Sequence, residues 1–123
     1  MKSTQLPDDL RQLMPLTPAV FFVLFSLSDG EKHGYAIMQE TTTLSGGRFR
    51  MGPGTLYTTL QRLLDMGLIE EARGKRSGVD EDARRRYYRL TGSGKLLLDA
   101  ELDRMDSVVR LARRRKLVPG TAE

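Results

Sequence analysis

The residues best suited to chemistry lie within residues 51–67, and their groups suit hydrogen bonding to a polar polymer. If this segment winds at about 100° per residue, its polar side chains gather on one side. Hydroxyl, amide and guanidinium groups bind base edges and phosphate oxygens, so this side is a candidate DNA contact. The residues concerned are Thr55, Thr58 and Arg62, with Gln61 on the flank of this side and Tyr57 at its border.

The charge around this segment fits the same chemistry. No Asp or Glu lies between Glu40 and Asp65, whereas Arg48, Arg50 and Arg62 are basic. A helix that enters a DNA groove must keep carboxylates away from phosphate. An ordinary amphipathic helix with a solvated polar face would give the same pattern, so the segment alone leaves both interpretations open.

The opposite side of the segment predicts a helix that packs on a core. Pro53 suits the first turn of a helix, and Gly67 suits the residue just past its end. The apolar residues that share the buried face are Leu56, Leu60, Leu63 and Leu64.

Two further helices are predicted before this one. Thr17 and Pro18 suit the N-cap and first turn of a helix whose residues 19–27 are apolar on nearly every side. Such a helix is buried on most faces, which indicates a contact with a second subunit in so small a chain. Residues 33–44 predict the next helix, and the breaker at residues 45–47 separates it from residues 51–67. Helix, short turn, helix is the helix-turn-helix order.

The segment after Gly67 predicts a wing. Residues 68–73 and 84–90 have the composition of strands, and a polar loop joins them. The acidic run at residues 80–82 would repel phosphate, so we expect this loop tip to point away from DNA or to pair with arginines. The cations of the predicted wing are Arg73, Lys75, Arg76, Arg84, Arg85 and Arg86.

A long final helix is predicted over residues 95–116, with the apolar spacing of a coiled coil. Because no remaining domain is left for it to pack on, we interpret its stripe as a dimerisation face rather than as intramolecular core. A small hydrophobic effector bound at Phe22, Met105 and Val109 is a second use of the same surface. The predicted dimer interface comprises Phe21, Phe22, Phe25, Leu98, Leu102, Met105, Val108, Val109 and Ala112.

Length and composition restrict the class of protein. The 123 residues fit one small domain with an appended helix, and a net charge of +4 permits nucleic-acid binding without establishing it. The chain has no cysteine and one histidine, so it offers no thiolate metal site and no nucleophile–histidine–carboxylate set. We therefore expect no enzyme activity, no metal and no cofactor. The longest apolar run, residues 19–25, is too short to cross a bilayer and no signal peptide precedes it, so we expect a cytoplasmic protein and no membrane partner.

Taken in order, the motifs resemble the PadR family of bacterial winged-helix transcriptional regulators over about residues 16–98. The Gly-Thr-Leu-Tyr and Tyr-Tyr-Arg-Leu-Thr pieces together are quite specific. The matching pieces are His33-Gly34-Tyr35, Gly46-Gly47-Arg48-Phe49, Pro53-Gly54-Thr55-Leu56-Tyr57, Gly67-Leu68-Ile69-Glu70 and Arg86-Tyr87-Tyr88-Arg89-Leu90-Thr91.

The resemblance implies a homodimer that mostly represses transcription and is often released by a small effector. It also implies that Thr55, Tyr57 and Thr58 contact DNA from the recognition helix and that Tyr35 lies near phosphate. The chain departs from the family at Gly52, where a small polar residue is common, and it has no Trp on which an effector could stack.

Together these patterns predict a mainly α fold with a small β-hairpin. We expect an N-terminal arm or short helix over residues 1–15 and a winged helix-turn-helix domain over residues 16–91. A dimerisation helix over residues 92–117 and a disordered tail over residues 118–123 complete the chain. The functional hypothesis is a homodimeric repressor that binds double-stranded DNA at a pseudo-palindromic operator. The competing hypothesis is a winged-helix module that binds protein and not nucleic acid, because a fold does not fix a function.

Overall fold

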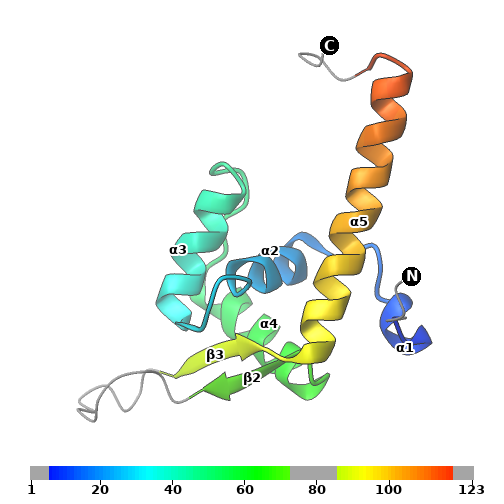
Figure 1. The fold of residues 1–123 in the computed structure, drawn as a ribbon. Helices are drawn as coiled ribbons and strands as arrows, with labels where there is room; N and C mark the ends of the chain where they lie inside the picture. Colours follow the sequence, from blue (N-terminus) through cyan, green and yellow to red (C-terminus); the bar gives the residue numbers. More distant parts are fainter. Residues whose placement is uncertain (1–5, 73–85, 118–123) are drawn as a thin grey trace.

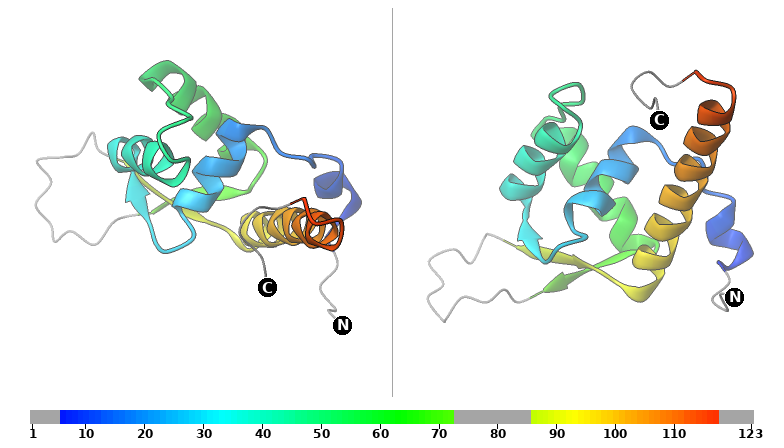
Figure 2. Two further views of the ribbon diagram at one scale, coloured as in Figure 1. Left: turned by 90° about the horizontal axis from the view of Figure 1, so that it is seen from above. Right: turned by 45° about the horizontal axis from the view of Figure 1, so that its top comes forward.

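The computed structural model describes residues 6–72 and 86–117, and the expected disordered tail lies outside them. A central helix, α2, lies between the α3–α4 pair and the long helix α5, and it packs against all three (Figure 1, Figure 2). This arrangement confirms the predicted winged helix-turn-helix with a long C-terminal helix. In chain order the elements are α1 (Asp8–Arg11), α2 (Pro18–Ser26), β1 (Lys32–His33), α3 (Gly34–Leu44), α4 (Pro53–Asp65), β2 (Ile69–Ala72), β3 (Tyr87–Leu90) and α5 (Gly92–Arg114).

The α2 helix is apolar on nearly every side because other helices surround it. Its start is as predicted: Pro18 occupies the first turn, and the Thr17 side chain accepts a hydrogen bond from the Val20 N–H at 3.3 Å. Val23 and Leu24 are completely buried in the core. A wholly apolar helix is therefore explained largely within one subunit.

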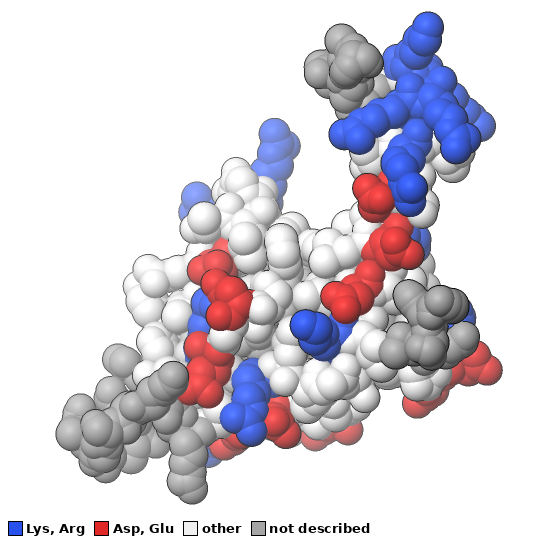
Figure 3. Space-filling model, viewed as in Figure 1, with Lys and Arg blue, Asp and Glu red and all other residues white. Residues whose placement is uncertain are grey.

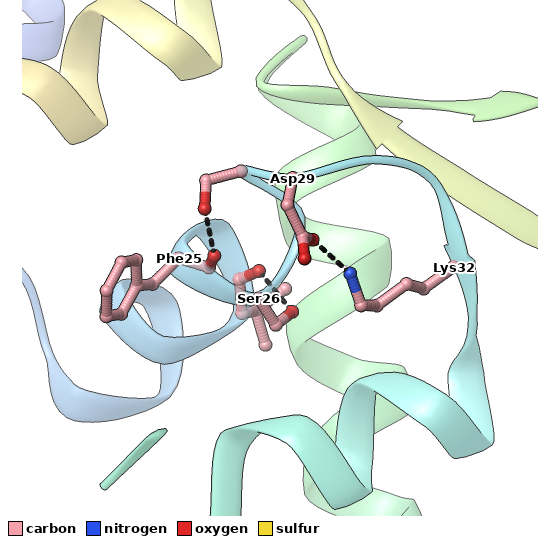
Figure 4. Close-up of polar contacts among 6 residues, drawn as sticks. Phe25, Ser26, Asp29 and Lys32 are labelled. Atoms are coloured by element: carbon pink, nitrogen blue, oxygen red, sulfur yellow. Dashed lines mark hydrogen bonds and ion pairs between the residues drawn. The ribbon is translucent and has the colours of Figure 1, made fainter. Parts of the chain in front are cut away.

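The turn after α2 is fixed by polar contacts (Figure 4). The Ser28 hydroxyl donates to the Phe25 carbonyl at 2.7 Å, and Lys32 forms an ion pair with Asp29. The hydrogen bond from Lys32 lowers the pKa of the Asp29 carboxyl. These contacts direct the chain from the end of α2 into β1.

The sheet contains a strand that the sequence did not predict. Its order is β1–β3–β2, and both pairings are antiparallel. β1 consists of Lys32 and His33 only, and His33 lies opposite Tyr87 of β3. Two residues are too short to show the alternation by which a strand is recognised in a sequence. The predicted hairpin is thus two strands of a three-stranded sheet.

The α5 helix begins at Gly92, three residues before the predicted start at Lys95. The Thr91 hydroxyl caps it by accepting from the Gly94 N–H at 3.1 Å, and it also donates to the Gly67 carbonyl at 2.6 Å. Gly94 is required by space, because a Cβ there would lie 2.0 Å from the Leu68 carbonyl oxygen. Gly92 and Gly94 are therefore part of the helix, and the first turn of α5 lies against Leu68 between α4 and β2.

The expectation that α5 has no domain to pack on is wrong for its first half. Leu97, Leu98 and Glu101 are buried in the core, and α5 packs against α2 and β3. The half after Met105 extends past the domain and is exposed (Figure 1). A stripe with coiled-coil spacing serves as intramolecular core along one half of the helix only.

Candidate nucleic-acid interface

The turn between α3 and α4 is held by one hydroxyl and one aromatic ring. The Ser45 hydroxyl accepts from the Phe49 N–H at 2.9 Å and donates to the Thr42 carbonyl at 3.0 Å. The Phe49 ring stacks on Phe22 of α2, with ring centres 5.9 Å apart. Because Phe49 is anchored inward, its neighbours Arg48 and Arg50 are both exposed beside α4.

The polar face of α4, which we define as Thr55, Thr58, Gln61 and Arg62, is exposed as the sequence predicted. The opposite face is buried, with Leu56, Leu60 and Leu63 at most 1% exposed and Leu64 partly buried. The helix thus presents two hydroxyls, an amide and a guanidinium to solvent while its leucines hold it on the core. These groups have the donor and acceptor character that base edges and phosphates require.

Two polar side chains of the predicted site are engaged within their own helices. The Gln61 amide donates to the Asp65 carboxylate at 3.0 Å, which fixes its orientation at the end of α4. Gln39 donates to the Tyr35 hydroxyl at 3.4 Å, and Tyr35 is 59% exposed at the start of α3. Tyr35 therefore lies on the surface, where the resemblance expects a phosphate contact.

Three arginines on or beside α4 differ from the described arginines of the wing in their charge partners. Arg48, Arg50 and Arg62 form no ion pair with any residue that the structure describes. Their charges are therefore available to a polyanion, and exposed cations near a recognition helix are the groups that neutralise DNA phosphates.

The described part of the wing is less basic than predicted. Arg86 pairs with Glu71 across the hairpin at 3.3 Å, and Arg89 pairs with Glu70 at 2.7 Å. The Glu70 partner raises the pKa of Arg89. Arg86 stays a predicted DNA contact of the wing, and in this structure its guanidinium is paired with a carboxylate of the facing strand. The other predicted wing cations, and the acidic tip, lie outside the described residues: Arg73, Lys75, Arg76, Arg84, Arg85, and residues 80–82.

The predicted dimer residues fall into buried and exposed groups. Phe21 and Leu98 are 7% and 2% exposed within the subunit, so they have little surface left for a partner. This corrects their assignment to the interface: both side chains fill the subunit's own core. The partly buried members are Phe22, Phe25, Leu102, Met105 and Ala112, and the exposed members are Val108 and Val109.

The three proposed effector residues differ in burial. Phe22 and Met105 pack against the core cluster, whereas Val109 is 38% exposed on the projecting part of α5. A second subunit would have to complete any cavity that uses all three.

Two residues have structural roles that the sequence analysis did not predict. The His33 ring caps α3 by accepting from the Ala36 N–H at 3.3 Å, and it meets the Tyr87 ring edge-on. The completely buried Glu101 accepts from the Leu16 N–H at 3.0 Å and pairs with Arg104 at 2.7 Å. A lone Glu in a helix stripe resembles any surface residue, so only the fold reveals its role.

The described residues contain no group of three or more His, Cys, Asp or Glu side chains that could hold a metal ion. No helix among them has the length and apolar content needed to cross a membrane.

Comparison with known proteins gives one consistent family. Residues 23–100 match the family model described as the transcriptional regulator PadR-like family. A transcriptional regulator of Mycobacterium tuberculosis is 36% identical over 89 residues, which cover 72% of this chain and 76% of that protein. An uncharacterized 37.1 kDa protein in a transposon of Streptomyces fradiae is 38% identical over 92 residues. The match spans 75% of this chain but only 24% of the Streptomyces protein.

A solved structure of the same fold includes DNA. The crystal structure of Bacillus subtilis PadR in complex with operator DNA superposes with a TM-score of 0.57 at 27% identity. The superposition covers 73% of this chain and 48% of that one.

Proposed function

Because this chain belongs to the PadR-like family of transcriptional regulators, we propose that it is a sequence-specific DNA-binding protein that represses transcription as a homodimer. The observation that carries the proposal is the polar face of α4, exposed on a helix whose other face is buried. A similar fold holds operator DNA in the Bacillus subtilis protein. In the proposed complex, the two α4 helices of a dimer enter successive major grooves, with centres ~34 Å apart on a pseudo-palindromic site.

The proposed contacts divide by chemistry. Thr55, Thr58 and Gln61 are the base-edge contacts, and Arg62 contacts either a base edge or a phosphate. Arg48 and Arg50 neutralise phosphates beside the groove, and the exposed phenol of Tyr35 donates a hydrogen bond to a phosphate oxygen. Binding should therefore weaken steeply as salt concentration rises.

The test is a fluorescence-anisotropy titration of the fragment upstream of the protein's own gene, at low and raised salt. Arg62→Ala should lower affinity by roughly tenfold, as expected for loss of a contact worth about 1–3 kcal/mol. Lys95→Ala is the matched control, because Lys95 is an exposed cation on α5, a different helix from the proposed contact face. Equal loss in both variants would mean that only net charge matters. Absence of salt-sensitive binding by the unmodified protein would instead favour the protein-binding module.

The proposed dimer interface is the exposed half of α5. Val108, Val109 and Leu111 are 54%, 38% and 51% exposed on this projecting helix. Apolar side chains grouped on a helix that leaves its own domain indicate a partner surface. The half-buried Phe22 and Phe25 extend the proposed interface onto α2.

Charge along α5 favours an antiparallel pairing of two copies. Asp99, Asp103 and Asp106 are exposed along the middle of the helix, whereas its last turns carry basic residues. Figure 3 shows this separation as an acidic stretch leading to a basic tip. Antiparallel helices would place each basic tip, formed by residues 113–116, beside the acidic stretch of the partner.

The effector proposal concerns the same surface. A hydrophobic cation lodged at Phe22, Met105 and Val109 would raise the melting temperature of the dimer, because a ligand that binds the native state stabilises it. A thermal-shift screen of such cations that gives no shift would leave these residues as dimer contacts only.

A further inference from the structure

The hydroxyl end of the Tyr57 ring lies against the first residue of α3. A Cβ built on Gly34 would lie 2.8 Å from the Tyr57 hydroxyl oxygen and 3.3 Å from two of its ring carbons, Cε1 and Cζ. Real side chains essentially never tolerate the shorter of these distances. Gly34 is buried, and its φ lies outside the left-handed region, so its backbone conformation would accept any residue. A side chain at residue 34 would therefore require the Tyr57 ring to shift.

This contact joins the recognition helix to two other elements. Gly34 follows His33, which belongs to β1 and caps α3. After burial and the Glu71 carboxylate, the Tyr57 phenol is also one of the groups that raise the pKa of Tyr88 on β3. Tyr57 thus reaches from α4 to the start of α3, next to β1.

Tyr57 as a whole is 52% exposed, and its hydroxyl end faces Gly34. A phenol used to recognise a base edge would have to direct its oxygen toward the groove. Here the oxygen faces the backbone at Gly34 of the neighbouring helix.

We propose that Tyr57 is a positioning residue, seated on Gly34, which sets the rotation of α4 relative to α3 and the sheet, and that its hydroxyl does not recognise a base. This contact between Tyr57 and Gly34 holds the polar face of α4 at one angle to the sheet. It requires space for the Tyr57 ring at Gly34. This inference rests on the proposed DNA binding and assigns one residue of that site a role different from direct contact.

The test is a double-mutant cycle with two readouts, the melting temperature and the affinity for the upstream fragment. Tyr57→Phe removes only the oxygen, so it should leave affinity within about threefold of the unmodified protein. Gly34→Ala should lower affinity by roughly tenfold or more, because the added methyl displaces the ring. The double variant Gly34→Ala/Tyr57→Phe should recover much of that loss, since only the 3.3 Å ring contacts remain and these need a few tenths of an ångström.

Gly92→Ala is the matched control for the glycine change. Gly92 is also the first residue of a helix, α5, but a Cβ there would meet nothing within 4 Å. Gly92→Ala should leave the affinity for DNA unchanged, and it should not lower the melting temperature. A Gly34→Ala defect that Gly92→Ala lacks is then due to the ring and not to the loss of glycine at a helix start.

Three results would overturn the inference. Gly34→Ala could bind DNA like the unmodified protein, Tyr57→Phe could lose as much affinity as Tyr57→Ala, or the double variant could be no better than Gly34→Ala alone. If Gly34→Ala fails to fold, recovery of the fold in the double variant still tests the contact between Tyr57 and Gly34. If the unmodified protein does not bind the fragment, the proposed function fails, and non-additive melting temperatures in the cycle still decide whether Tyr57 sits on Gly34.

Discussion

We expect the charge of Glu101 to stabilise the contact between the N-terminal segment and α5. Glu101→Gln removes this charge at nearly constant side-chain shape. The carboxylate is completely buried, accepts from the Leu16 N–H at 3.0 Å, and receives two hydrogen bonds from Arg104 at 2.7 and 3.0 Å. Hydrogen bonds to a charged group contribute about 1.5–3 kcal/mol to stability. The Arg104 side chain is 40% exposed, so water screens part of the ion pair and we take the lower half of this range.

A loss of about 1.5–2 kcal/mol would lower the melting temperature by roughly 6–8 °C, at about 4 °C per kcal/mol for a domain of this size. The effect should depend on pH. The Arg104 hydrogen bond lowers the pKa of Glu101, with a further contribution from the Leu16 N–H, while burial opposes them. A carboxyl whose pKa is lower in the folded state stabilises the protein above its unfolded pKa, and this contribution is lost as pH falls through the folded pKa.

Melting curves of the unmodified protein and Glu101→Gln from pH 7 to pH 3, followed by circular dichroism, test this reasoning. The gap between the two should be widest near neutral pH and should narrow in acid, where the unmodified side chain is also neutral. Asp103→Asn is the control, because Asp103 is exposed on the same helix and has no ion pair among the described residues. A gap that stays constant over the whole pH range would refute a charge-based tie.

Three further changes probe the proposed interfaces. Val109→Glu should shift the protein from dimer to monomer in size-exclusion chromatography with light scattering, because it places a charge in the proposed apolar contact; an unchanged mass would rule out that contact. Gly54→Ala should raise the free energy of unfolding by up to about 1 kcal/mol, seen as a higher melting temperature, because a Cβ there meets nothing within 4 Å and alanine favours helix. If DNA approaches α4 closely at this point, Gly54→Ala should also weaken binding, whereas Gly92→Ala should not; equal affinities would place the DNA backbone farther away. Ser45→Ala should lower the free energy of unfolding by about 1 kcal/mol, seen as a lower melting temperature, because the Phe49 N–H loses its acceptor. Hydrogen exchange at the Phe49 amide should also become faster.

The recognition helix was predictable because its signals are local. Pro53 begins α4, Gly67 follows it in the left-handed conformation with φ of 73°, and the leucine spacing defines the buried face. Each of these signals depends on residues within one or two helical turns. The same holds for the start of α2 at Thr17 and Pro18, where the cap and the first-turn proline are adjacent in the chain.

The features that escaped prediction depend on residues far apart in the sequence. β1 exists because His33 pairs with Tyr87, and Glu101 is buried because the Leu16 N–H meets it. A Cβ at Gly34 would meet Tyr57, which belongs to another helix. Arg86 is neutralised by Glu71 across the hairpin. A single sequence carries no periodic signal for such pairs, so only the assembled fold reveals them.

The two halves of α5 show how one pattern serves two purposes. Leu98 and Val109 both lie on the stripe with coiled-coil spacing, yet Leu98 is 2% exposed and Val109 is 38% exposed. The difference follows from where α2 ends: α5 packs on α2 along its first half and then leaves the domain. In the proposed dimer, the free half of α5 would carry the partner, and α2 would transmit its position to α3 and α4. Any ligand or substitution that rotates α5 on α2 should therefore change the spacing of the two recognition helices, and so the affinity for DNA, without touching the polar face of α4.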